Sequence, residues 1–508
     1  MQFLSQLSLI SSTRSALTNS ANSTASYSDR SLRMTSMEKL HWFDRDPQFP
    51  NFVFATLRFT SRIDPQVARQ SLAIALQRQP LASMRPKLVG GRWYWQPLED
   101  QQLDGERVFR SLELRETEQV SGIAVGETDQ DYVSYFLTLV NFSESKSAGE
   151  TVSEVRFHSH HAASDGVASI GLINDWLMVY NNLIAGNLAE TGLVELDATS
   201  FQNRGVLGLL SWNFLKGLPC QAIAMFGAVK FIFRKTCEIL PESVPSETSQ
   251  PFPAILGAWV EEDVLEADRR RANDNQVGFA AWCLAKCFVA LDSWHQTRVV
   301  PSSATSQQKA TSLWRILLPI STRSRQDRAS VAANRTAIVQ IDRQPPMGDG
   351  ERVSGELISD ELISDELISD ELISFSQSID YEINFIRRWQ LEKMFLIVIR
   401  LASFSNSWLS KVANNPNSRG AAVFTHLGRP FKRAMIHVNR LAKSIEPDSL
   451  ARPVDFDLAG PIRSGTPINI SFARFDGRLK ICLHYDACIV STHQANRLLA
   501  KIVDLFSD

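Results

Sequence analysis

The sequence has few cysteines and almost no net charge. It contains 6 cysteines among 508 residues, too few for the disulfide framework of a small secreted protein. Its formal net charge is −2, so it lacks the excess of basic residues expected of a nucleic-acid-binding protein. We therefore expect an enzyme of the reducing cytoplasm and no nucleic-acid partner.

Long hydrophobic runs and two common catalytic motifs are also missing. Neither a glycine-rich phosphate loop nor a G-x-S-x-G turn stands out. The most apolar stretch, residues 205–233, contains Lys216, Pro219 and Lys230, and its longest charge-free run is shorter than the roughly 20 residues of a membrane span. We interpret it as helices that link two halves of the chain. A peripheral membrane contact, or a wall for a lipid substrate, is the alternative.

Two cysteines lie four residues apart in a predicted helix, Asn273–Leu291. Cys283 and Cys287 could form half of a metal site, but no other potential ligand lies close to them in sequence. Cysteine is also a small apolar residue that is often buried. We therefore interpret this pair as part of the core.

The most informative stretch is Val155–Gly166, with the sequence VRFHSHHAASDG. Its alternation predicts a strand that ends on two histidines. One face carries the mostly apolar set Val155, Phe157, Ser159 and His161. The other face carries Arg156, His158 and His160. The two adjacent histidines therefore face opposite sides, and only His161 lies on the apolar side.

A helix is predicted to follow this strand. Asp165 is a suitable N-cap, and the apolar positions Ile170, Ile173, Leu177 and Ile184 form one helical stripe. An imidazole at a strand end, above the start of a helix, is well placed to act as a general base. Its ordinary pKa of about 6.5 suits that role at cellular pH.

The chain divides into four predicted regions. Residues 1–36 are a disordered tail, or the start is assigned incorrectly and Met34 or Met37 is the initiator. Residues 37–204 form a first α/β half, residues 205–253 a helical connector and linker, and residues 254–508 a second half.

Several elements are predicted within the two halves. Strands are expected at 53–60, 93–95, 132–142, 314–320, 336–341 and 421–428. Asp64-Pro65 begins a helix that ends before Pro80. Asp476-Gly477 is the turn of a β-hairpin with alternating apolar strands. The chain ends in a helix with an apolar stripe from Ala495 to Phe506.

Residues 356–374 repeat the sequence Glu-Leu-Ile-Ser-Asp. A five-residue period fits neither a strand nor a helix, because successive Leu-Ile pairs would rotate by about 140° around a helix axis. We predict an insertion in a surface loop, although these residue types could also hold it helical. No chemistry is assigned to it.

The residues His160, His161, Asp165 and Gly166 match the pattern H-H-x-x-x-D-G. This stretch resembles the active-site motif of an acyltransferase superfamily that includes chloramphenicol acetyltransferase, peptide-synthetase condensation domains and wax ester synthases. Leu318–Arg323 with Asn334, and Thr425–Gly428, resemble segments of the wax ester synthase branch, except that His426 replaces the usual asparagine. The resemblance covers residues 37 to about 506.

The resemblance implies a fold of two similar α/β sandwich halves with a tunnel and an active site between them. It implies that His161 is the general base and that the acceptor attacks the acyl thioester without an acyl-enzyme. Asp165 would hold the motif loop through an ion pair, for which Arg323 is the candidate partner. Gly166 would allow a tight turn and keep its amide near the reacting carbonyl. His160, Asn334, Thr425 and Gly428 are the supporting motif residues.

The same resemblance implies the substrates. The donor would be acyl-CoA or an acyl group on the phosphopantetheine of a carrier protein, and the acceptor an alcohol or an amine, with no bound cofactor. The apolar stretch 205–233 favours a lipid-like acyl chain. Three alternatives remain: a purely structural strand-turn-helix, a metal site built from His158, His160, His161 and Asp165, and a non-catalytic protein that binds an acyl carrier or a lipid.

Overall fold

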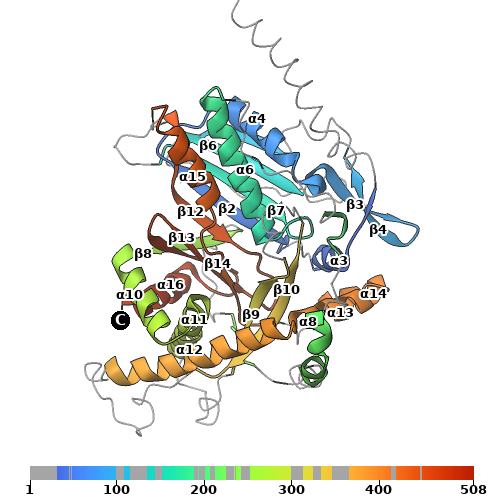
Figure 1. Cartoon of the computed structure of the whole chain (residues 1–508), viewed down its shortest axis with the longest axis vertical. Helices are drawn as coiled ribbons and strands as arrows, with labels where there is room; N and C mark the ends of the chain where they lie inside the picture. The colour runs from blue at the N-terminus through green and yellow to red at the C-terminus, as the bar shows by residue number, and fades with distance from the viewer. Residues whose placement is uncertain are drawn as a thin grey trace, which may run out of the picture.

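The computed structural model describes most of the chain outside its N-terminal 30 residues. The described residues are 31–44, 46, 48–98, 108–114, 134–143, 151–187, 193, 201–205, 212–224, 234, 236–241, 252–298, 313–323, 333–345, 365–413, 419–446 and 449–507. Within them the chain forms two lobes, each built on a mixed β-sheet with helices on one face (Figure 1). The predicted α/β architecture of two halves is confirmed.

The first lobe contains a five-stranded sheet covered by three helices. Its strand order is β12 (Pro453–Ala459), β2 (Phe52–Phe59), β7 (Ser153–His160), β6 (Tyr135–Phe142) and β5 (Phe109–Leu114). The helices are α4 (Pro65–Leu76), α6 (Gly166–Ile184) and α15 (Lys432–Leu441). Helix α6 contacts both α4 and α15, which explains why more than one stripe of α6 is buried.

A small sheet extends this lobe. It consists of β1 (Leu32–Arg33), β4 (Arg92–Pro97) and β3 (Met84–Val89), which follows the 3₁₀ turn η2 (Pro80–Ser83). The predicted strand at 93–95 is therefore confirmed. The expectation that ordered structure begins near Met37 is wrong, because β1 pairs with β4 and the side chain of Met34 is buried in the core.

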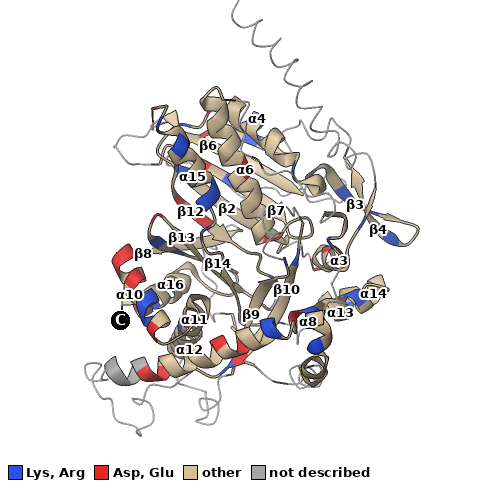
Figure 2. Ribbon diagram, in the orientation of Figure 1, with Lys and Arg blue, Asp and Glu red and all other residues tan. Residues whose placement is uncertain are grey.

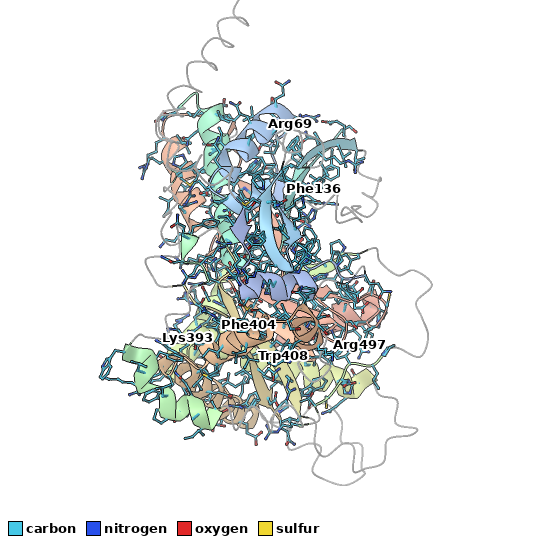
Figure 3. All side chains as sticks on the ribbon, turned by 90° about the vertical axis from the view of Figure 1, so that its right-hand side faces the viewer. Arg69, Phe136, Lys393, Phe404, Trp408 and Arg497 are labelled. Carbon is cyan, nitrogen blue, oxygen red and sulfur yellow. The ribbon has the colours of Figure 1, made fainter. Side chains whose placement is uncertain are left out.

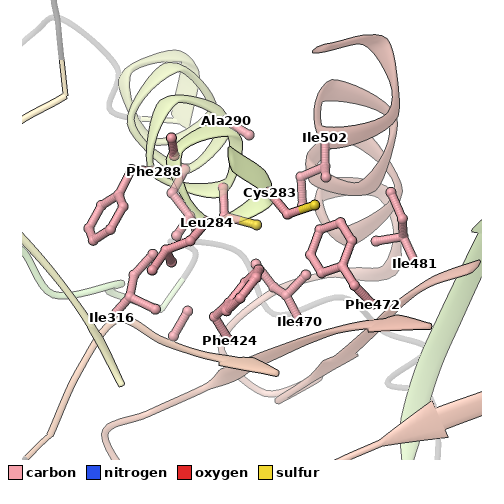
Figure 4. Close-up of a cluster of buried hydrophobic side chains, with 14 of the residues drawn as sticks. Cys283, Leu284, Phe288, Ala290, Ile316, Phe424, Ile470, Phe472, Ile481 and Ile502 are labelled. Atoms are coloured by element: carbon pink, nitrogen blue, oxygen red, sulfur yellow. The ribbon is translucent and has the colours of Figure 1, made fainter. Parts of the chain in front are cut away.

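The second lobe contains a six-stranded sheet. Its order is β10 (Thr336–Arg343), β9 (Trp314–Ser321), β11 (Ala422–His426), β13 (Ile468–Phe475), β14 (Arg478–Tyr485) and β8 (Ala254–Val260). Helices α10 (Glu262–Asp274), α11 (Phe279–Arg298), α12 (Asp365–Arg388) and α16 (Thr492–Ser507) complete it. Apolar side chains of α11, α16 and the sheet, such as Phe288, Ile502 and Phe472, form its core (Figure 4). The predicted hairpin and final helix are confirmed.

A segment of the second half crosses to the first lobe. Strand β12 pairs with β2, and α15 packs on α6. Two buried asparagines of α6 hold this segment: Asn174 donates to the carbonyl of Pro430 at 2.7 Å, and Asn181 donates to that of Ala451 at 3.0 Å. The lobes in space therefore do not coincide with the predicted division at residues 205–253.

Four further helices lie beside the two lobes or between them. They are α3 (Ser36–Phe43), α8 (Trp212–Lys216), α13 (Glu392–Ala402) and α14 (Asn406–Ala413). Thr35 and Glu38 cap α3 with reciprocal hydrogen bonds. Helix α3 contacts α13 and α14 of the second half, so this N-terminal helix also joins the two parts of the chain.

The predicted helix 273–291 is two helices in the structure. Helix α10 ends at Asp274, and α11 begins only at Phe279. Between them Gln276 has a φ of 56°, in the left-handed region that ends many helices. The prediction was wrong because the apolar spacing of α11 continues past this turn toward residue 273.

The expected surface loop at the five-residue repeat is wrong for residues 365–374. Residues 356–364 lie outside the described part of the chain, but Asp365 begins α12, and Leu372 and Ile373 pack against the core of the second lobe. Of the residues predicted as an apolar connector, 212–224 are described, and 206–211 and 225–233 are not.

Within the described ranges, no single helix is both long and apolar enough to cross a membrane. Helices α10 and α11 meet that length and hydropathy test only as a pair, and they are bent by 106° relative to each other.

Candidate active site

The histidine pair lies at the end of β7, at the interface of the two lobes. Pairing of β7 with β2 and β6 on either side fixes the strand. The backbone N–H of His161 donates to the carbonyl of Asn51 at 2.8 Å, and the hydroxyls of Ser159 and Ser169 hydrogen-bond at 2.6 Å, which ties β7 to α6. The alternation predicted from the sequence is present, and His161 is the first residue of the turn.

His160 has a structural environment. Its side chain is buried, and its Nδ1 accepts a hydrogen bond from the backbone N–H of Ala162 at 3.1 Å. Its ring contacts those of Phe52 and Trp42 at centroid distances of 5.1 and 5.8 Å. His160 therefore stabilises the turn and points away from His161.

The hydrogen bonds of His161 define its tautomer. Its Nδ1 lies 2.9 Å from the carbonyl oxygen of Ser164. Nδ2 of Asn334 lies 3.2 Å from the same Nδ1, but it donates to the carbonyl of His161 at the shorter distance of 2.7 Å. Since the carbonyl of Ser164 only accepts, Nδ1 carries the proton and Nε2 carries the free lone pair. Burial lowers the pKa of His161 below its ordinary value of 6.5, although the Ser164 bond and the charge of Asp165 oppose this shift. The imidazole is thus neutral at pH 7 and presents a basic Nε2.

Asp165 connects the motif loop to both lobes. One carboxylate oxygen accepts from the N–H of Ala168 at 3.0 Å and so caps α6. The other accepts from Nη1 of Arg323 at 2.5 Å, from the N–H of Arg335 at 2.8 Å and from the hydroxyl of Thr336 at 3.0 Å. Burial alone would raise the pKa of Asp165, but the charge and hydrogen bonds of Arg323 lower it below its ordinary value. Asp165 is therefore a buried carboxylate that organises the loop.

Asn334 supports the backbone of the turn that carries His161. Its Nδ2 donates to the carbonyl of His161 at 2.7 Å, and its Oδ1 accepts from the N–H of Thr336 at 3.1 Å. The side chain of Asn334 is buried and lies between β9 and β10. It thus fixes the position of His161 from the opposite lobe.

The structure separates the remaining motif residues. Thr425 lines the cavity described below, whereas Gly428 is not among the lining residues and has a φ of 65° after β11. His426 points elsewhere and contacts the ring of Phe279 at 6.0 Å.

The backbone conformation of Gly166 does not itself require a glycine, and its expected place near the reacting carbonyl stays a prediction. Gly166 is the first residue of α6, has no positive φ, and lines the cavity. A Cβ at this position would meet only a methyl group of Leu427, at an ordinary contact distance of 3.5 Å.

A cavity of about 120 Å³ lies beside His161, with walls from both lobes. From the first lobe come His41, Asn51, Val53, Ala55, His161, Gly166, Ser169, Ile170 and Ile173, with Asp44 after α3. Strands and loops of the second half supply mainly apolar groups, among them Leu317, Pro319, Ile338, Val423, Leu427, Leu458 and Ile462. Such a lining suits an apolar chain with a reactive group at the histidine.

Sequence analysis missed His41 of α3. Its ring lies 4.1 Å from that of His161 between centroids, at an angle of 32°, and it lines the same cavity. Nδ2 of Asn51 donates to the carbonyl of His41 at 3.1 Å and lies 3.4 Å from its Nδ1. With Nδ1 accepting from this amide, the ring of His41 would carry its proton on Nε2.

The Nε2 of His41 is buried, and no residue in the described ranges hydrogen-bonds to it. Burial lowers the pKa of His41 well below its ordinary value, and the neighbouring His161, His160 and Arg463 lower it further. Hence His41 is a neutral imidazole whose buried Nε2 has no hydrogen-bond partner among the described residues. A single histidine 120 residues before the motif gave no signal in the sequence, since only the packing of α3 brings it here.

A second missed pair, Asp44 and Arg463, also lines the cavity. Their side chains approach to 3.4 Å. Burial raises the pKa of Asp44, and the charge of Arg463 opposes that shift. This ion pair joins the end of α3 to the loop before β13 and places charged groups in a cavity whose lining is mainly apolar.

The described residues give no support to the metal alternatives. They contain no group of three or more His, Cys, Asp or Glu side chains placed to hold a metal ion. His158 faces away from His161 and stacks on Phe136 at 6.0 Å. Cys283 and Cys287 are buried in the core of the second lobe, and burial raises the pKa of both thiols.

Comparison with known proteins identifies the fold. No protein-family model and no curated protein matches the sequence. Among solved structures, trichothecene 15-O-acetyltransferase from Fusarium sporotrichioides has a TM-score of 0.61 and 12% identity, over 94% of this chain and 94% of that one. The first condensation domain of the calcium-dependent antibiotic synthetase, in complex with a substrate analogue, has a TM-score of 0.60 and 12% identity, over 94% and 97%.

A third structure is the starter condensation domain of rhizomide synthetase in complex with C8-CoA and Leu-SNAC. It has a TM-score of 0.56 and 10% identity, over 95% of each chain. The chain therefore has the two-lobed fold shared by condensation domains and this acetyltransferase, as the H-H-x-x-x-D-G resemblance predicts. The resemblance to wax ester synthases stays a prediction.

Proposed function

We propose that this protein is an acyltransferase that moves an acyl group from a thioester to a hydroxyl or an amine. The observation that carries the proposal is that His161 is neutral and has a free Nε2. Its side chain lines a mainly apolar cavity between the two lobes. A base in this position takes the proton from the acceptor as the acceptor attacks the thioester carbonyl. The C–S bond of the tetrahedral intermediate then breaks, and the sulfur takes the proton back from the His161 imidazolium and leaves as a thiol, so no acyl-enzyme forms.

His41 has the complementary role in this proposal. The attack places negative charge on the former carbonyl oxygen, which requires a hydrogen-bond donor. The Nε2–H of His41 is such a donor, because its ring lies beside that of His161 and no described residue accepts its proton. A neutral imidazole can serve as an electrophile when its pKa is depressed. His161 thus acts as the base and His41 binds the developing oxyanion.

The donor and acceptor classes follow from the cavity. Its apolar lining favours an aliphatic acyl chain, carried by CoA or by the phosphopantetheine of a carrier protein, and an uncharged alcohol or amine as acceptor. Solved structures with this fold include a condensation domain in complex with C8-CoA and a trichothecene 15-O-acetyltransferase, which supports this choice. The lipid-like substrate and the cytoplasmic location stay proposals.

The test is thiol release and product formation in vitro. Purified protein is mixed with acyl-CoA of increasing chain length, or with an acyl carrier protein loaded with the same chain, and with a panel of alcohols and amines. Release of thiol is followed by a colour reagent and the acylated product by mass spectrometry. We expect acceptor-dependent release by the wild-type protein and a loss of about 10²–10⁴-fold in His161→Ala.

The alternative function is a non-catalytic protein that binds an acyl carrier or a lipid. In that case neither wild type nor His161→Ala would release thiol above the background without enzyme, while acyl-CoA would still bind. Retention of more than about a tenth of the wild-type rate in His161→Ala, well outside the range for loss of a general base, would exclude His161 as that base.

A further inference from the structure

Helices α13 and α14 expose large apolar side chains on their outer face. Their inner face is buried, with Leu396, Ile399 and Leu409 packed in a cluster that includes residues of α3 and β10. On the outer face lie Val398, Leu401, Phe404 and Trp408. Phe404, in the turn between the helices, is 81% exposed, and Figure 3 shows Phe404 and Trp408 close together near the middle of the view.

A second exposed apolar segment adjoins these helices. In residues 212–224, Trp212 is 69% exposed and Ile223 is 73% exposed. The segment is held beside the start of α13, since Nζ of Lys393 lies over the ring of Phe214 at 5.6 Å and Nε2 of Gln221 donates to the carbonyl of Trp389 at 3.0 Å. We call the exposed side chains of residues 212–224 and 393–413 the apolar–basic face.

The charges of this face all have the same sign. Residues 212–224 and 393–413 contain Lys216, Lys393, Arg400 and Lys411 and no acidic residue. Figure 2 shows Lys and Arg on α8, α13 and α14, whereas acidic residues occur along α12. Arg400, Lys411 and the apolar Phe404 are all exposed, so cationic and apolar groups are available to the same partner.

We propose that the apolar–basic face binds the surface of an anionic membrane. Tryptophan, phenylalanine and leucine side chains insert at the boundary of headgroups and acyl chains, and lysine and arginine interact with anionic headgroups. A second copy of the chain is a poor occupant, because two identical faces would bring only positive charges together. This inference does not depend on the acyltransferase proposal.

The position of the face relates it to the cavity. Helix α3 contacts the inner side of α13 and α14 and carries His41, which lines the cavity. One helix layer therefore separates the proposed membrane surface from the candidate active site. A protein held in this way would have its cavity close to apolar substrates in the bilayer.

The test is sedimentation of the full chain with vesicles. One set of vesicles contains only phosphatidylcholine, and the other contains phosphatidylcholine and phosphatidylglycerol. We expect binding to the anionic vesicles that weakens as salt is added, with a blue shift of tryptophan fluorescence that decreases in Trp408→Ser and disappears when Trp212 is replaced as well. Neutralising Arg400 and Lys411 together as glutamines should weaken binding by about thirtyfold, at about 1 kcal/mol for each charge.

Matched variants serve as controls. Tyr381→Ser replaces an aromatic residue of α12 that is 73% exposed and lies next to Asp380 and Glu382. Arg440→Gln removes an exposed charge from α15 on the other lobe. Both control variants should bind anionic vesicles as the wild type does, while Phe404→Ser with Trp408→Ser should bind at least about tenfold more weakly.

Four results would overturn the proposal. They are no binding to anionic vesicles, equal binding to both kinds of vesicle, equal loss in the control and test variants, and a self-association seen by light scattering that Phe404→Ser with Trp408→Ser abolishes. Binding of an acidic acyl carrier protein that the same variants abolish, without vesicle binding, would assign the face to that partner instead. Vesicle binding is measured without acyl transfer. The membrane proposal can therefore be tested even if the protein has no acyltransferase activity.

Discussion

The imidazole rings of His41 and His161 lie 4.1 Å apart between centroids, and an asparagine amide lies near the Nδ1 of each ring. His161 carries its proton on Nδ1, bound to the carbonyl of Ser164, and in the proposed mechanism His41 carries its proton on Nε2. Burial lowers the pKa of both rings, and His161 lowers that of His41 further, so both are neutral at pH 7. The pair thus offers one acceptor and one donor to a substrate.

His41→Phe should lower kcat without unfolding the protein. Phenylalanine keeps the ring contact with His161 but removes the N–H donor at the cavity. Loss of one oxyanion donor typically costs about 10²–10³-fold in kcat, whereas KM should change little. Steady-state kinetics with the best acyl-CoA and acceptor pair would measure both constants.

His41→Gln is the conservative partner of that variant. Its side-chain amide can place an N–H near the former Nε2, so we expect it to recover most of kcat. If His41→Phe and His41→Gln have the same kcat, or if both variants change only thermal stability, His41 is a packing residue and not an oxyanion donor. Nitrogen-15 NMR of histidine would show independently whether His41 is protonated on Nε2.

The ion pair of Asp165 and Arg323 should be costly to break. Both side chains are fully buried, and their atoms approach to 2.5 Å. Asp165→Asn or Arg323→Met leaves the partner charge buried and should lower the free energy of unfolding by about 3–5 kcal/mol. Urea denaturation measures this loss. The double variant should lose less than the sum of the single ones.

A surface pair of similar length is the control for that prediction. Arg62 and Glu113 approach to 2.6 Å, but their side chains are 54% and 52% exposed. Arg62→Met should therefore cost no more than about 1 kcal/mol. If breaking the surface pair lowers the free energy of unfolding as much as breaking the buried pair, burial is not the reason for the cost at Asp165.

Activity should be lost in acid but not between neutral and mildly alkaline pH. Burial lowers the pKa of His161 below 6.5, and only its neutral form accepts a proton. The kcat/KM should therefore be constant near pH 7 and fall as the pH drops below 6.5, with a midpoint under the ordinary histidine value. Rates measured in a pH series, with recovery after return to pH 7, would check this. A midpoint above 6.5 would contradict the burial argument.

His426→Asn should reduce the acid sensitivity of the fold. Burial lowers the pKa of His426 to about 4, and Arg474 contributes to this shift. Below 6.5 the unfolded chain binds a proton that the folded chain refuses, so stability is full above 6.5 and decreases as the pH falls toward 4. At pH 5 the loss is on the order of 2 kcal/mol for this group.

Asparagine at position 426 cannot bind a proton in the unfolded chain, so the free energy of unfolding of His426→Asn should fall less steeply between pH 6.5 and 4. Urea denaturation at several pH values measures the slope. His493→Asn serves as the control, because His493 is exposed in α16. Equal slopes for wild type and His426→Asn would show that His426 does not titrate in this range.

Local sequence predicted much of the second lobe and of the catalytic strand. The alternation before Gly166, the cap at Asp165 and the turn at Asp476-Gly477 are each determined within about ten residues. Neighbouring residues also predicted the final helix, because its apolar stripe repeats with the helical period. Such features need no partner distant in the chain.

Predictions from the sequence were wrong where a local pattern is compatible with two kinds of structure. The five-residue repeat fits neither period, yet residues 365–374 form the start of α12, whose later residues pack against α11. Helix α10 was also missed as a separate element, because the residue with a positive φ between α10 and α11 is Gln276 and not a glycine. Tertiary packing decided both cases.

By itself the sequence determined the histidine strand, the cap of α6, the separation of His160 from His161 and, through a family resemblance, the pairing of Asp165 with Arg323. Only the tertiary structure decided that His41 completes the site, that β12 belongs to the first lobe, and that the apolar side chains of α13 and α14 face outward. Strand alternation and helix capping are local forces that act between neighbours. The other contacts join residues more than a hundred positions apart, so they exist only once the lobes have packed.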